Sequence, residues 1–159
     1  MVDVIARNAK SQDFYHTHAT GSFGYKWMPE KLKEKGFDID EKSHIDVKEY
    51  IYDMPLRLSA CDAVVCRAGA ITLGEVTALG KPSVLIPSPN VTNNHQYHNA
   101  MSLVNENAAL IIEEKDLTSE LLYEKVLKLK SDNTLCKTLS ENASRLALVN
   151  AAEEIYKNL

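Results

Sequence analysis

The sequence predicts an α/β protein built on a Rossmann-like, doubly wound parallel sheet. Short apolar runs of strand length alternate along the chain with segments of helical spacing. The runs at 63–66 and 83–86 are continuously apolar, which is typical of strands that are covered on both faces. A chain of 159 residues with 45% hydrophobic residues can bury a sizeable core, so we expect one domain over residues 1–159.

The first part of the chain predicts helices and strands in alternation. In chain order we expect a helix ending near residue 10, a strand at 13–20, a loop at 21–24, a helix that runs to residue 35 and stops at Gly36, and a strand at 44–50. His16 and His18 share one face of the strand at 13–20, because side chains alternate along a strand. A His-x-His pair can bind a metal ion, but no third ligand is evident nearby, so we expect an ordinary strand end at a cleft.

The rest of the chain continues the alternation. The expected elements are a helix at 56–60 with Asp53 as its N-cap, a strand at 63–66, a helix at 70–79 closed by Gly80, a strand at 83–86, a helix at 94–106, a strand at 108–112 and helices from 116 onward. An apolar stripe in residues 133–158 is expected to pack in the core, and it consists of Leu135, Leu139, Leu146, Val149 and Ile155.

Residues 62–75 predict a nucleotide-binding turn. A buried strand ends at Cys66, small residues around Gly69 allow a sharp turn, and a helix follows. The first N–H groups of a helix have no partner inside it, and the helix dipole adds positive charge, so this helix start would attract phosphate. Thr72 adds a hydroxyl, and Glu75 on the same helical face could accept two hydrogen bonds from a ribose diol. The alternative is an ordinary strand-turn-helix junction without a ligand.

A second polar segment, residues 88–99, follows the next strand. Its neutral amides and imidazoles suit sugar hydroxyls, which need hydrogen-bond donors and acceptors rather than charge. The alternative is a capped helix with Thr92, Asn93 or Asn94 as the N-cap. Open α/β sheets bind ligands at the carboxyl ends of their strands, so we expect this segment and the turn at 67–72 to lie at one edge.

Charge and composition argue against several other classes of protein. The formal charge of −4 and the absence of a dense stripe of Lys and Arg argue against nucleic acid as a partner. No apolar run is long enough to span a membrane, and the N-terminus lacks the layout of a signal peptide. The three cysteines form no Cys-x-x-Cys pair, which favours reduced thiols in a cytoplasmic core over a structural zinc site.

These motifs together resemble the C-terminal halves of the family 28 glycosyltransferases. The matching residues are Val65-Cys66-Arg67-Ala68-Gly69-Ala70 with Thr72 and Glu75, then Gly80-Lys81-Pro82, Pro87, and Asn94-His95-Gln96-Tyr97 with Asn99 and Ala100. The resemblance covers nearly the whole chain. It implies a GT-B architecture whose C-terminal half binds the donor, UDP-GlcNAc. The implied reaction is the inverting transfer of N-acetylglucosamine to lipid I, the undecaprenyl-pyrophosphoryl-MurNAc-pentapeptide, which gives lipid II in bacterial peptidoglycan synthesis.

The resemblance also implies roles for single residues. The implied donor-binding residues are Ile51 for uracil, Ala70, Ile71 and Thr72 for the phosphates, with Gly69 in the same turn, Glu75 for the ribose, and His95 and Gln96 for the hydroxyls of N-acetylglucosamine. Arg67 sits beside the phosphate turn and could add charge there, with a surface or core-edge role as the alternative. His95 stands where some members of the family have glutamine. Neither a metal ion nor a cofactor is implied.

Members of the family are much longer than this chain, and their N-terminal half supplies the acceptor side. We expect that half to be missing here, together with the general base. The implied complete enzyme is cytoplasmic and peripheral on the inner face of the cytoplasmic membrane, and this chain alone is expected to be nearly inactive. Three alternatives stay open: a stand-alone donor-binding subunit that needs a separate membrane partner, a UDP-sugar 2-epimerase-like protein, and a non-catalytic nucleotide-sugar-binding domain.

Overall fold

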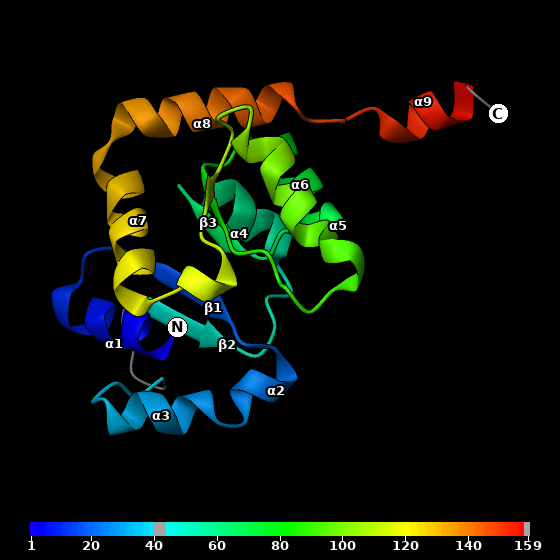
Figure 1. The fold of residues 1–159 in the computed structure, drawn as a ribbon. Helices are drawn as coiled ribbons and strands as arrows, with labels where there is room; N and C mark the ends of the chain where they lie inside the picture. Colours follow the sequence, from blue (N-terminus) through cyan, green and yellow to red (C-terminus); the bar gives the residue numbers. More distant parts are fainter. Residues whose placement is uncertain (40–43, 158–159) are drawn as a thin grey trace. The chain divides into compact units, whose positions relative to one another are not determined.

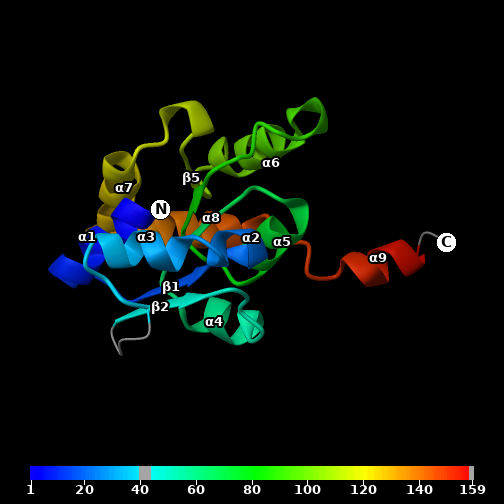
Figure 2. The ribbon, with the colours of Figure 1, turned by 90° about the horizontal axis from the view of Figure 1, so that it is seen from below.

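The computed structural model describes residues 1–39 and 44–157, which group into two compact units. Unit 1 comprises Met1–Met54 and Thr118–Tyr123, and unit 2 comprises Pro55–Leu117 and Glu124–Leu159. All strand pairs are parallel, so the predicted α/β class with parallel strands is confirmed. Figures 1 and 2 show the elements of each unit. The prediction of one domain over residues 1–159 stays a prediction.

Unit 1 contains a two-stranded parallel sheet with helices from the first part of the chain. Its elements are α1 (Val2–Ser11), β1 (His16–Ala19), α2 (Gly21–Tyr25), α3 (Met28–Glu34) and β2 (Ile45–Lys48). His16 lies opposite Ile45 in the sheet, and Gly36 follows α3 with a φ of 84°, as expected of a residue that ends a helix. The buried core of this unit consists of Ile5, Met28, Leu32, Phe37, Ile45 and Val47.

The prediction of a loop at 21–24 is wrong, because these residues form most of α2. Gly21 begins the helix with a φ of 68°, a conformation that favours glycine. Gly24 is buried, and a Cβ at this position would lie 3.1 Å from Cβ of Thr20. Glycine lowers intrinsic helix propensity by about 1 kcal/mol per residue, which is why the sequence indicated a loop. Local packing overrides that propensity here.

The segment Thr118–Tyr123 also belongs to unit 1, where Tyr123 is completely buried. The Tyr123 ring packs against Phe14 with 5.6 Å between ring centroids. The guanidinium carbon of Arg7 lies 4.0 Å from the centroid of the same ring, within the range of a cation–π interaction. A residue late in the sequence therefore completes the interior of the first unit.

Unit 2 contains a three-stranded parallel sheet in the order β3-β4-β5. Its elements are α4 (Met54–Ala60), β3 (Val64–Cys66), α5 (Ala70–Ala78), β4 (Ser83–Leu85), η1 (Thr92–Asn94), α6 (His95–Val104), β5 (Leu110–Ile111), η2 (Glu114–Asp116), α7 (Ser119–Ser131), α8 (Asn133–Arg145) and α9 (Ala151–Lys157). The first residue of α4 and the first five residues of α7 belong to unit 1. Val65 lies opposite Val84, and Val84 lies opposite Leu110. The buried core includes Ala68, Leu73, Leu85, Ala100, Leu103, Ala108, Ala109 and Ala143.

The predicted C-terminal stripe is only partly buried. Leu139 in α8 is 2% exposed, as the stripe predicted. Leu146, Val149 and Ile155 are 36%, 71% and 64% exposed, so for these three residues the prediction is wrong. The physical reason is the break after Arg145, because residues 146–150 are not helical and interrupt the helical spacing on which the stripe depends.

The expectations about membrane-spanning segments and about the cysteines can be compared with the described residues. Within residues 1–39 and 44–157, no helix is long and apolar enough to cross a membrane. Cys61, Cys66 and Cys136 are free thiols. Burial raises the pKa of the Cys66 thiol, at the end of β3, to about 11, so this thiol is protonated near neutral pH.

Candidate functional site

The candidate site lies at the edge of unit 2 where β3, β4 and β5 end. The three strands are adjacent and parallel, so their carboxyl ends meet at one edge of the sheet. β3 leads into the turn at 67–69, β4 into the loop at 86–91, and β5 into the segment at 112–114. Such an edge is where open α/β sheets bind ligands.

The turn after β3 leads directly into α5 and leaves amide groups available. Gly69 is the N-cap with extended backbone angles, a φ of −71° and a ψ of 140°. Leu73 donates its backbone N–H to the carbonyl of Gly69 at 3.0 Å. Within the described residues, the N–H groups of Ala70, Ile71 and Thr72 have no hydrogen-bond partner. Unpaired amides at the start of a helix, together with the helix dipole, are the features by which helix N-termini bind anions in proteins generally.

The side chains on this part of α5 divide between the core and solvent. Leu73 and Val76 are buried and fix the helix on unit 2. Ile71 is 83% exposed, and Glu75 is also exposed. Neither the Thr72 hydroxyl nor the Glu75 carboxylate has a partner among the side chains that the structure describes. Both groups are therefore available to a ligand at the helix start.

Helix α6 holds the turn in place. The side-chain amide of Asn99 donates a hydrogen bond to the backbone carbonyl of Ala68 at 3.1 Å. Ala68 itself is completely buried. A buried carbonyl in a turn needs such a donor, because an unpaired one costs free energy. Asn99 thus links the polar segment after β4 to the turn after β3.

Arg67 points toward the neighbouring strand ends. Its Nη1 donates to the backbone carbonyl of Ile86 at 3.2 Å and forms an ion pair with the carboxylate of Glu114. The side chains of Arg67 and Glu114 are 51% and 39% exposed. One guanidinium therefore connects the segments that follow β3, β4 and β5.

The polar segment after β4 leaves its amide and imidazole groups largely available. The carboxamide oxygen of Gln96 accepts a hydrogen bond from the Ser88 backbone N–H at 2.9 Å, which leaves the side-chain NH₂ as the donor for a ligand. Asn94 takes the N-cap position of α6 with a φ of 50°, but its side chain makes no capping hydrogen bond. η1 has none either. The structure thus shows no capping role for Asn93, Asn94 or Thr92, and His95 is exposed.

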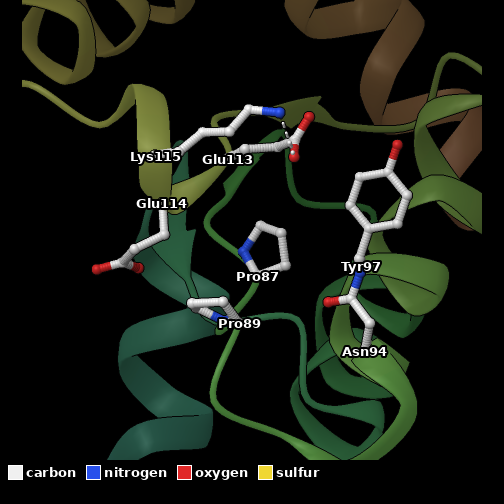
Figure 3. A pocket seen from close by; sticks show the side chains of 7 residues that line it. All are labelled: Pro87, Pro89, Asn94, Tyr97, Glu113, Glu114 and Lys115. Atoms are coloured by element: carbon white, nitrogen blue, oxygen red, sulfur yellow. Dashed lines mark ion pairs between the residues drawn. The ribbon is translucent and has the colours of Figure 1, made fainter.

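A cavity of about 360 Å³ opens beside this segment. Figure 3 shows the side chains that line it, with the Tyr97 ring and Pro87 facing the opening and Lys115 paired with Glu113. The lining residues are Pro87, Pro89, Asn94, Tyr97, Glu113, Glu114 and Lys115. The sequence interpretation omitted Tyr97 as a site residue and all of residues 113–115. The position of 113–115, directly after an expected strand, was the signal that could have indicated them.

The remaining predicted groups lie in unit 1. Ile51 follows β2 and is partly exposed. The rings of His16 and His18 lie 5.7 Å apart, and burial together with the two neighbouring histidines lowers the pKa of His16 to about 4. No group of three or more His, Cys, Asp or Glu side chains in the described ranges is placed to hold a metal ion. His16 and His18 are thus neutral, partly or largely buried rings near physiological pH.

The sequence was compared with known protein families and with individual proteins. The family described as "Glycosyltransferase family 28 C-terminal domain" matches residues 1–157. A relative from Acetivibrio thermocellus is 41% identical over 157 residues, which are 99% of this chain and 41% of the relative. A relative from a Thermoanaerobacter species is 44% identical over 138 residues, 87% of this chain and 37% of the relative. Both are named "UDP-N-acetylglucosamine--N-acetylmuramyl-(pentapeptide) pyrophosphoryl-undecaprenol N-acetylglucosamine transferase".

A solved structure is similar over the same extent. The crystal structure of Acinetobacter baumannii MurG superposes with a TM-score of 0.77 and 25% identity, over 98% of this chain and 45% of that one. This similarity confirms the expected GT-B half as the fold. The chain spans about two fifths of the length of the curated relatives it matches.

Proposed function

Since the chain belongs to glycosyltransferase family 28 and matches the C-terminal domain of that family, we propose that it binds the donor UDP-GlcNAc for an N-acetylglucosaminyl transfer. The observation that carries this proposal is the start of α5, where the amides of Ala70, Ile71 and Thr72 are unpaired within the described chain. A diphosphate at this position would be stabilised by the amides and by the helix dipole.

Other polar side chains of the candidate site are proposed to bind the ribose and the sugar of the donor. Glu75 is exposed one turn further along α5, where its carboxylate is free to accept hydrogen bonds from a ribose diol. His95 and the NH₂ group of Gln96 would contact the sugar. The assignment of uracil to the backbone of Ile51 stays a prediction.

In the transfer reaction, this half would stabilise the leaving group. The bond from the sugar to the diphosphate breaks as the acceptor hydroxyl attacks, and negative charge develops on the departing UDP. The amides at the start of α5 and the Thr72 hydroxyl would stabilise that charge. We propose that the acceptor side and the general base come from the rest of a two-domain enzyme, that the acceptor is lipid I, and that the enzyme is peripheral on the inner face of the cytoplasmic membrane. Donor binding is proposed to need no cofactor.

A titration with nucleotides and sugar nucleotides tests the proposal directly. The folded chain is titrated with UDP-GlcNAc, UDP-glucose, UDP and GDP-mannose, and binding is followed by NMR. We expect selective binding of the uridine nucleotides, with UDP-GlcNAc bound more tightly than UDP-glucose. Glu75→Ala should weaken UDP-GlcNAc binding by about tenfold or more, because it removes a charged hydrogen-bond acceptor.

Glu106→Ala is the matched control, because Glu106 is an exposed glutamate that follows the C-terminal end of α6, whereas His95 and Gln96 lie at the N-terminal end. It should bind UDP-GlcNAc like the unaltered chain. Equal weakening by both substitutions would mean a general charge effect and would remove Glu75 from the site. Indifference of the folded chain to all four compounds would contradict donor binding by this domain.

A further inference from the structure

The side chain of Arg67 is anchored through one of its three nitrogens. Both contacts of the guanidinium within the described chain, to the Ile86 carbonyl and to the Glu114 carboxylate, run through Nη1. Nε and Nη2 contact no hydrogen-bond or ion-pair partner in the part of the chain that the structure describes. A guanidinium presents five N–H donors in a planar fork. Most of these donors are therefore available for another anion.

Arg67 also lies close to the proposed phosphate position along the chain. Only two residues separate it from Ala70, the first residue of α5, so the two Cα atoms are at most about 11 Å apart. Its own segment leads into the unpaired amides at the start of that helix. An arginine held at this place could add a charged donor to a diphosphate that the amides bind.

Glu114 differs from its acidic neighbour in what it contacts. The Glu113 carboxylate pairs with Lys115 at 3.2 Å and is thereby neutralised within its own segment. The Glu114 carboxylate pairs with Arg67, 47 residues earlier in the chain. Residues 113–116 contain three acidic side chains, yet only Glu114 reaches across the strand ends to the turn after β3.

We propose that Glu114 is a positioning residue for Arg67 in donor binding. Its carboxylate holds Nη1 against the Ile86 carbonyl and leaves the other guanidinium N–H groups for the diphosphate of the nucleotide. A free arginine side chain would lose its rotamer freedom when the ligand binds, whereas an anchored one has already lost it. The inference rests on the proposed function, because it assumes that a nucleoside diphosphate binds at the start of α5.

The test compares UDP with uridine, which lacks the diphosphate. Affinities for both compounds are measured by NMR titration on the unaltered chain and on Glu114→Ala, Glu114→Gln, Arg67→Gln and the double variant Arg67→Gln/Glu114→Ala. We expect Glu114→Ala to weaken UDP binding by about three- to tenfold and to leave uridine binding unchanged. Glu114→Gln should keep most of the UDP affinity, because its carboxamide oxygen can still accept from Nη1.

The double variant separates positioning from a direct role. When Arg67 is already replaced, removal of the Glu114 carboxylate should have no further effect on UDP affinity. Asp116→Ala is the control for charge, because Asp116 is an exposed carboxylate in the same segment and does not line the cavity. It should bind UDP like the unaltered chain.

Each other outcome decides against the inference. An effect of Glu114→Ala that persists in the Arg67→Gln background, or a gain in UDP affinity, would show that Glu114 does not act by placing Arg67. Equal losses for UDP and uridine would indicate damage to the whole site. Failure of the folded, unaltered chain to bind either compound would overturn the proposed function itself, and the inference with it.

Discussion

The hydroxyl of Tyr123 donates a 2.6 Å hydrogen bond to Oδ2 of Asp13, 110 residues away in the sequence. The same hydroxyl lies 2.6 Å from Oγ of Ser11. Tyr123 is completely buried, so these polar partners satisfy a group that has no access to water. The pair links the start of α7 to the segment between α1 and β1, and it allows a tyrosine to fill the interior of unit 1.

Replacement of Tyr123 by Phe should lower the free energy of unfolding by about 1–3 kcal/mol. The substitution keeps the ring but leaves the Asp13 carboxylate without this charged hydrogen bond. Urea denaturation followed by circular dichroism measures the change. Tyr156→Phe is the matched control, because Tyr156 is 80% exposed, and its effect should stay within about 0.5 kcal/mol. Equal effects of the two substitutions would contradict a structural role for the buried hydroxyl.

Gly69→Ala should weaken UDP binding without unfolding the protein. The Gly69 backbone is extended, and a Cβ there would meet no atom of the described chain within 4 Å. The free energy of unfolding should therefore change by less than about 0.5 kcal/mol. A diphosphate close to the backbone would lose room, so the UDP affinity measured by NMR titration should fall. Unchanged affinity in the stable variant would place the diphosphate away from this turn.

Gly80→Ala, unlike Gly69→Ala, should destabilise the fold and lower the free energy of unfolding by about 1–3 kcal/mol. Gly80 has a φ of 58°, and an added Cβ would collide with the Ser144 hydroxyl and lie 3.3 Å from the Ser140 carbonyl. Gly74→Ala in α5 is the control, because a Cβ there meets nothing within 4 Å in the described chain. It should raise the free energy of unfolding by about 0.5–1 kcal/mol. Urea denaturation distinguishes these opposite signs.

His16 should make unit 1 less stable in mild acid. Burial, with the charges of His18 and His44, lowers the pKa of His16 from 6.5 to about 4. The folded protein then binds this proton more weakly than the unfolded chain, so protonation favours unfolding. The resulting decrease in the free energy of unfolding is small above pH 6.5 and grows as the pH falls from 6.5 toward 4. The expected loss between pH 7.5 and pH 5 is about 2 kcal/mol.

The His16 prediction is checked by urea denaturation at both pH values, with His16→Asn as the comparison. The variant should lose less stability on acidification than the unaltered chain, whatever its stability at pH 7.5. Part of the pH dependence should remain, because burial also lowers the pKa of His18. The same pH dependence in both proteins would rule out His16 as its source.

The sequence predicted best the elements that local signals define. The limits of β3, α5 and β4 agree with the predicted limits to within about two residues, because continuous apolar runs and the turn residues Gly69 and Gly80 mark them. The short helix α2 was missed because glycine opposes helix formation when packing is ignored. The C-terminal stripe failed because a break after Arg145 changes which faces are buried.

The parts of the site that depend on distant contacts could not be predicted. The sequence indicated the helix start, Glu75 and the polar segment after β4, since each is a local pattern. It could not show that Arg67 pairs with a carboxylate 47 residues later, or that Asn99 supports the carbonyl of Ala68. Side-chain direction depends on tertiary packing, which no local pattern encodes.

Unit 1 combines residues 1–54 with residues 118–123, and this separation in the sequence affects folding during translation. Synthesis on the ribosome proceeds from the N-terminus, so residues 1–54 emerge long before Tyr123. Until then, Phe14 lacks the ring that covers it, and the Asp13 carboxylate lacks its phenol donor. Unit 1 therefore completes its interior only after most of unit 2 has been translated, and a fragment that stops at Met54 would lack the side chain that closes it.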